Sequence, residues 1–174
     1  MSCTTLWREA DALHSMAVSG TPDLAVRRAE VADAETIGWL LHDFSIEHED
    51  PTPGPDILAE RVGRLLASDE FVVLLAGAGS HGLAMLRFRP AIWNEAPECY
   101  LAGLYVVPDC RGQGLGRALM EAAIETARRQ GADRMKLGTS EDDVAARALY
   151  ESLGFDNRKG RPDGPISYYY EREL

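Results

Sequence analysis

The chain has 174 residues, 45% of them hydrophobic and 26% charged, which is the composition of one ordinary globular domain. Its formal net charge of −10 argues against a nucleic-acid partner, because phosphate binding normally needs a basic face. No apolar run approaches the roughly 18 residues of a membrane helix. Residues 1–20 also lack the apolar block of a signal peptide, so we expect a cytoplasmic protein without a membrane partner.

Residues 1–23 end in Ser-Gly-Thr-Pro-Asp and are interpreted as an N-terminal extension, which leaves residues 24–174 as the domain. Hydrophobic periodicity and turn residues predict the following elements in chain order: strand 24–29, a helix capped by Asp33, loop 49–55, helix 56–67, strands 71–76, 83–89 and 99–107, helix 115–130, strand 134–139, helix 143–153 and strand 166–172. The two consecutive helices and the hairpins favour an α/β (α+β) fold with a mixed, mostly antiparallel central sheet and helices on both faces.

The most informative segment is the Gly-rich loop that joins strand 99–107 to the next helix. The first N–H groups of that helix have no partner inside it and favour an anion. The glycines at 112, 114 and 116 remove side chains that would hold a pyrophosphate away from the backbone, and two arginines add positive charge. Neither G-x-G-x-x-G nor the P-loop pattern fits this spacing, whereas R-x-x-G-x-G does.

Three blocks of sequence resemble the GNAT N-acetyltransferase superfamily. They are Leu104-Tyr-Val-Val-Pro108, Arg111-Gly-Gln-Gly-Leu-Gly116 and Ala146-x-x-Leu149-Tyr150-Glu-x-x-Gly154-Phe155. Their order and spacing match as well, so the resemblance covers nearly all of the chain after residue 23. It implies a fold in which two parallel strands splay apart. It also implies an enzyme that transfers acetyl from acetyl-CoA to a primary amine by direct attack in a ternary complex.

The resemblance further implies how acetyl-CoA is held, as a co-substrate and without a metal. The pantetheine arm would lie along the splayed strand on backbone groups of Leu104 and Val106, and the Val106 N–H would polarise the thioester carbonyl. Asp143 stands where the family often has Asn, and a helix cap is the role expected for it. The residues implied to bind the cofactor are Leu104, Tyr105, Val106, Arg111, Gly112, Gln113, Gly114, Leu115, Gly116, Arg117 and Asp143.

Tyr150 is the implied general acid, since a phenol near the sulfur can protonate the departing thiolate. It also lies on the apolar face of its helix, so a packing role is the alternative.

The general base is open, because Gly138 and Ala102-Gly103 occupy two positions where many relatives carry Glu. Glu98, at the entrance of the splayed strand, is the first candidate. The other carboxylates considered are Glu47, Glu49, Asp50 and Glu141. The acidic residues at 47–50 could instead attract a cationic amine or form a solvated helix end.

The acceptor is expected to be a small cationic amine, a choice that the acidic balance favours. Two alternatives stay open: a protein acetyltransferase, and a sensor that binds acyl-CoA without chemistry. The sensor is motivated by the missing Glu at Gly138 and Ala102-Gly103. A homodimer is possible, as in other members of the family. No metal is expected, since Cys3, Cys99 and Cys110 and the four His residues lack ligand spacing.

Overall fold

The computed structural model describes residues 23–68, 70–93, 95–158, 163–168 and 172. Almost all of the expected N-terminal extension therefore lies outside the described residues, and so do residues 169–171 of the last predicted strand. The elements are β1 (Val26–Arg28), η1 (Val31–Asp33), α2 (Ala34–Glu47), α3 (Pro55–Leu66), β2 (Phe71–Ala76), β3 (Gly82–Arg89), β4 (Glu98–Val106), η2 (Pro108–Cys110), α4 (Leu115–Arg129), β5 (Arg134–Lys136) and α5 (Val144–Ser152).

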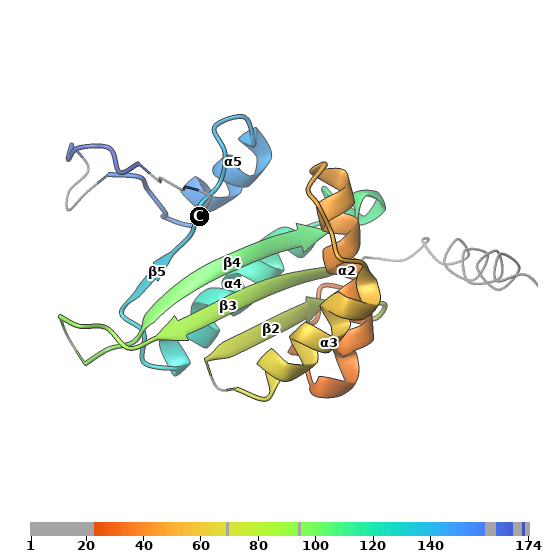
Figure 1. The fold of residues 1–174 in the computed structure, drawn as a ribbon. Helices are drawn as coiled ribbons and strands as arrows, with labels where there is room; N and C mark the ends of the chain where they lie inside the picture. The colour runs from red at the N-terminus through yellow and green to blue at the C-terminus, as the bar shows by residue number, and fades with distance from the viewer. Residues whose placement is uncertain (1–22, 69, 94, 159–162, 169–171, 173–174) are drawn as a thin grey trace, which may run out of the picture.

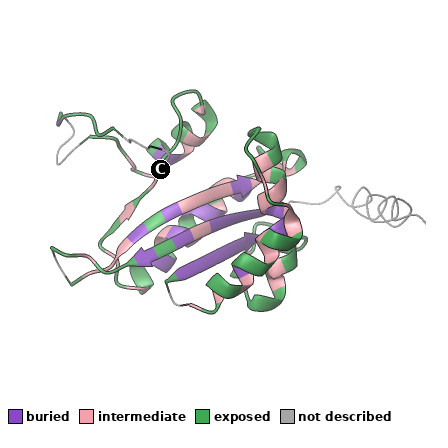
Figure 2. Cartoon of the chain, viewed as in Figure 1, coloured by how far each residue is buried: buried purple, intermediate pink, exposed green. Residues whose placement is uncertain are grey.

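The five strands form one sheet in sequence order, with antiparallel pairs from β1 to β4 and with β5 parallel to β4 (Figure 1). Helices α2 and α3 cover one face and α4 covers the other, which confirms the predicted architecture. Strand β2 shows why both faces of the sheet need a helical cover. Its odd-numbered side chains pack with α2 and α3, and its even-numbered side chains pack with α4. All six of its residues are buried (Figure 2).

Three boundaries differ from the prediction. Pro55 begins α3 instead of ending a loop, since the first helical position needs no N–H donor. Strand β5 ends at Lys136 instead of residue 139, because it pairs only with the first residues of β4. Of the last predicted strand, the described residues form only an isolated bridge between Arg158 and Ile166.

Two irregularities of β4 open the sheet on its β5 side. Met85 of β3 pairs with Gly103 and Leu86 pairs with Leu101, so Ala102 is an extra residue in a β-bulge. Parallel pairing with β5 stops at Tyr100. Beyond that residue no described strand lies against this edge of β4, and this confirms the predicted splay.

Helices α2 and α3 touch at Gly38. A Cβ atom at this position would lie 2.5 Å from the carbonyl oxygen of Pro55 and 2.8 Å from the backbone nitrogen of Ala59. We expect Gly38→Ala to lower the free energy of unfolding in urea by about 1–3 kcal/mol, because the two backbones must separate. Gly63→Ala is the matched control in α3, since its Cβ would meet only Ala34 at 3.7 Å. Helix propensity should make that control neutral or stabilising.

Asp33 joins β1 to the start of α2. Its carboxylate accepts from Arg27 at 2.6 and 2.8 Å and from the Glu30 N–H at 2.8 Å, and it does not cap α2 as the sequence suggested. The bond from Arg27, followed by that from Glu30, lowers the pKa of Asp33 to about 2.

A lowered pKa adds stability above the ordinary carboxyl range, and this stability is lost as the pH falls from about 4 to 2. We therefore expect Asp33→Asn to cost about 1–2 kcal/mol at pH 7, a figure reduced for the exposure of Arg27. The cost, measured by urea unfolding, should be smaller at pH 3. An equal difference at both pH values would show that the charge of Asp33 is unimportant.

Among the described residues, no helix has the length and apolar character that a membrane span requires.

Candidate active site

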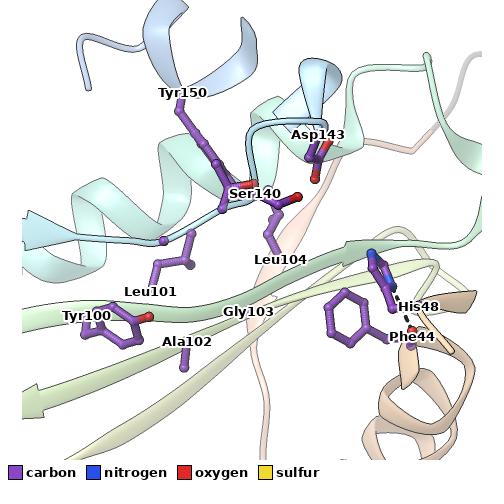
Figure 3. A pocket seen from close by; sticks show the side chains of 12 residues that line it. Phe44, His48, Tyr100, Leu101, Ala102, Gly103, Leu104, Ser140, Asp143 and Tyr150 are labelled. Atoms are coloured by element: carbon purple, nitrogen blue, oxygen red, sulfur yellow. Dashed lines mark hydrogen bonds between the residues drawn. The ribbon is translucent and has the colours of Figure 1, made fainter. Parts of the chain in front are cut away.

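A cavity of about 220 Å³ lies where β4 separates from the chain that follows β5 (Figure 3). Its walls come from the end of α2, the middle of β4, the segment after β5, and α5. The lining residues are Phe44, His48, Tyr100, Leu101, Ala102, Gly103, Leu104, Gly138, Thr139, Ser140, Asp143 and Tyr150. The splay of the sheet thus creates a site that four separate parts of the chain complete.

Tyr150 reaches into this cavity from α5 (Figure 3). Its side chain is only 8% exposed, and its ring makes an edge contact with Phe155 at 6.2 Å between centroids. Burial, helped by the negative charge of Asp143, raises the pKa of Tyr150 to about 12. The hydroxyl therefore keeps its proton at neutral pH and can donate it or a hydrogen bond inside the cavity. Tyr150 belongs to the core and also borders the cavity, so packing and chemistry are compatible here.

Asp143 precedes α5 and accepts a hydrogen bond from the Ala146 N–H at 3.0 Å. It therefore caps the helix that carries Tyr150. It also lines the cavity, and a contact with the cofactor stays a prediction.

The free edge of β4 exposes backbone groups beside the cavity. The Val107 N–H donates to the His81 carbonyl of the neighbouring β3 end at 2.9 Å, so strand alternation turns the Tyr105 N–H toward β3 as well. The N–H groups of Leu104 and Val106 then point to the open edge. Arg111 confirms this orientation, since its Nε donates to the Val106 carbonyl at 2.8 Å.

Tyr105 is the member of the predicted cofactor set that turns away from this edge. Its side chain is 5% exposed and packs at 5.6 Å against Phe44 on the α2 side of the sheet.

The Gly-rich loop presents unpaired N–H groups at the start of α4. Gly112 and Gly114 have φ values of 72° and 93°, which side chains rarely adopt. The first helical hydrogen bond runs from the Ala118 N–H to the Gly114 carbonyl, so the N–H groups of residues 115–117 have no acceptor within the helix. A Cβ atom on Gly112 would meet no atom within 4 Å. Such N–H groups at the start of a helix favour an anion, and a diphosphate at this place stays a prediction.

The polar side chains of the loop and of the first turn of α4 form hydrogen bonds with other residues of the chain. Arg111 makes two bonds of 2.6 Å to Glu47, and these hold the pKa of Glu47 below its usual range. Gln113 donates to a carbonyl of η2 at 3.0 Å, and Arg117 donates to Ser152 at 2.7 Å. The sequence pattern predicts that Arg111 and Arg117 both add positive charge for a phosphate. The structure places the Arg111 guanidinium on a carboxylate, where it ties the loop to α2.

Glu98, the first candidate base, is not among the residues that line the cavity. It accepts from Lys136 at 3.0 Å and from Arg89 at 2.8 Å. These bonds, that of Lys136 first, lower the pKa of Glu98. A carboxylate held by two cations is a poor proton acceptor, so Glu98 has no part in the reaction proposed below.

The other four carboxylates considered as bases also lie outside the cavity lining. In their place the structure brings His48 and Tyr100 to the cavity, and neither is among the site residues predicted from the sequence. The only available signal for His48 was its position within the acidic residues at 47–50. Within the described part of the chain, no three His, Cys, Asp or Glu side chains gather as metal ligands.

The sequence model of the Acetyltransferase (GNAT) family matches residues 34–155, from the start of α2 through the Gly-rich loop to just beyond α5. The chain belongs to the GNAT acetyltransferase family. Members of this family use acetyl-CoA as their co-substrate.

Two curated relatives and one solved structure illustrate the similarity. A mycothiol acetyltransferase of Renibacterium salmoninarum is 29% identical over 92% of this chain and 48% of its own length. An aminoglycoside N(6')-acetyltransferase type 1 of Stenotrophomonas maltophilia is 31% identical over 75% of this chain and 85% of its own. A protein of Arthrobacter sp. FB24, assigned as an acetyltransferase, is 44% identical with a TM-score of 0.77, covering 92% of this chain and 99% of that one. The chain spans about half or less of the length of these mycothiol acetyltransferases.

Proposed function

We propose that this enzyme transfers the acetyl group of acetyl-CoA to the primary amine of a small molecule, by direct attack in a ternary complex. The observation that carries the proposal is the cavity at the splay, which holds a buried, protonated Tyr150 hydroxyl beside the free edge of β4. The unpaired N–H groups at the start of α4 lie at the end of the same strand and loop.

The proposed binding mode uses the backbone. The N–H groups from Gly112 to Arg117 hold the diphosphate, and the outward groups of Leu104 and Val106 hold the pantetheine arm. When bound, acetyl-CoA supplies a thioester whose carbonyl carbon an amine can attack. Val106, predicted to serve the thioester, is not among the residues that line the cavity, whereas Leu104 is. The outward Leu104 N–H therefore polarises the thioester carbonyl, and Tyr150 gives its proton to the sulfur as the carbon–sulfur bond breaks.

The proposed acceptor is a small cationic amine. The net charge of −10 supports a cation, as does the acidic end of α2 near the cavity. The names of two groups of relatives also point to small molecules, mycothiol in one and aminoglycosides in the other. A cytoplasmic location and a homodimeric state belong to the same proposal and rest on the family resemblance and the sequence alone.

An assay of thiol release tests the proposal. The enzyme is given acetyl-CoA and a panel containing a polyamine, an aminoglycoside, an amino acid and a lysine peptide. We expect thiol release and an equal amount of acetylated amine, identified by mass spectrometry, for at least one small cationic member. Coenzyme A binding without transfer to any amine would indicate a sensor instead. A strong preference for the peptide would indicate a protein acetyltransferase.

A further inference from the structure

His48 borders the cavity from the end of α2, whereas Tyr150 borders it from α5 (Figure 3). An amine that attacks a thioester must lose a proton, while the departing sulfur must gain one. Two proton-carrying side chains on different walls can meet these needs without competing for one position. Tyr150 fits the sulfur side, so the other wall is where a proton acceptor is needed.

The hydrogen bonding of His48 determines which ring nitrogen can accept. Its Nδ1 lies 2.9 Å from the Phe44 carbonyl oxygen. A carbonyl oxygen only accepts hydrogen bonds, so Nδ1 carries the hydrogen and Nε2 of the neutral ring keeps a lone pair. The imidazole is also held in place, since it packs on the Phe44 ring at 4.4 Å between centroids. Phe44 in turn packs on Tyr105.

Two carboxylates close to His48 already have hydrogen-bond partners. Among the residues that the structure describes, Asp143 is the one carboxylate in the cavity lining, and it caps α5 beside Tyr150. Glu47 on the same helix is bound by Arg111. The titratable and charged groups around His48 are Glu47, Glu49, Asp50, Arg111, Tyr100, Tyr105, Asp143 and Tyr150.

His48 is also exposed to solvent, unlike Tyr150. A proton that reaches its Nε2 can therefore pass on to water, which resets the ring for the next cycle. A buried base would need a chain of waters for the same purpose.

We propose that His48 is the general base of the acetyl transfer. Nε2 of His48 takes one proton from the ammonium form of the amine, and the freed nitrogen lone pair forms the bond to the acetyl carbon. The carbon–sulfur bond breaks with its electron pair on sulfur, which takes the proton of Tyr150, and the second proton lost by nitrogen passes to solvent. The products are an amide and a thiol, and solvent returns His48 and Tyr150 to their starting states. This inference rests on the proposed function.

His48→Gln is the test, with His42→Gln as the matched control. His42 lies on the same helix, contacts Thr52 at 3.2 Å and does not line the cavity. With an alkyl amine near neutral pH, we expect His48→Gln to lower kcat by about 10²-fold or more, as loss of a general base does. The His42 variant should keep the wild-type rate.

Two further measurements separate proton transfer from a packing role. The decrease in kcat caused by His48→Gln should become smaller as the pH approaches about 10, where alkyl amines lose their proton in solution. It should also be smaller for a weakly basic amine that is already neutral at pH 7. A loss that is equal for both amines and at every pH would overturn the proposal, and so would wild-type activity in His48→Gln.

Failure of the proposed function gives a different result. In that case the wild-type enzyme itself acetylates none of the amines, whereas failure of the His48 proposal leaves wild-type turnover intact.

Discussion

Tyr150→Phe should lower kcat by about 10²–10⁴-fold, the usual contribution of one positioned acid. Coenzyme A affinity should stay close to that of the wild type, because the hydroxyl lies in the cavity and not at the Gly-rich loop. We expect kcat to fall because the variant lacks the hydroxyl proton. A phenylalanine ring keeps the contact with Phe155 but has nothing to donate to the sulfur. Steady-state kinetics with acetyl-CoA and the best amine of the panel measure the effect.

The pH dependence gives this prediction a sign. Because burial raises the pKa of Tyr150 to about 12, the hydroxyl should still hold its proton at pH 10.5, and the wild-type rate should not fall between pH 9 and 10.5 on its account. Phe155→Leu provides the contrast, since it weakens packing but keeps the hydroxyl. It should lower thermal stability more than Tyr150→Phe and lower kcat less. Equal kcat in wild type and Tyr150→Phe over the whole pH range would leave Tyr150 with packing alone.

Gly114→Glu should raise the Kd for coenzyme A by about 10²-fold or more, which corresponds to about 2.7 kcal/mol. A side chain at φ 93° strains the loop, and its carboxylate would stand where the diphosphate is expected. Isothermal titration calorimetry measures the change.

Gly131→Glu is the matched control, because Gly131 also has a positive φ of 81° and lies at the other end of α4 with no atom near its Cβ position. It imposes similar backbone strain far from the loop. We expect both variants to lose similar stability and only Gly114→Glu to lose affinity. If both variants lose affinity for coenzyme A, backbone strain explains the effect. If neither variant loses affinity, the Gly-rich loop is not part of the binding site.

Local chemistry explains which parts of the site could be predicted from sequence. The loop glycines and the start of α4 follow from backbone preferences within a few residues, and the structure confirms the positive φ at Gly112 and Gly114. Tyr150 and Asp143 could be placed because α5 has a clear apolar period and a cap. The sheet followed from apolar runs separated by turn residues.

The remaining features depend on contacts between distant parts of the chain. Glu98 is paired because β5 and β3 place Lys136 and Arg89 on either side of it. Arg111 is drawn to Glu47, a residue 64 positions earlier in the chain. His48 reaches the cavity only because α2 ends beside the splayed strand. No local pattern encodes these pairings, since they form only when the layers pack.

A crystal structure with coenzyme A bound tests the central claim most directly. We expect diphosphate oxygens within hydrogen-bond distance of N–H groups between Gly112 and Arg117, and the sulfur in the cavity beside the Tyr150 hydroxyl. Coenzyme A bound elsewhere, or with its sulfur outside the cavity between β4 and α5, would contradict the claim.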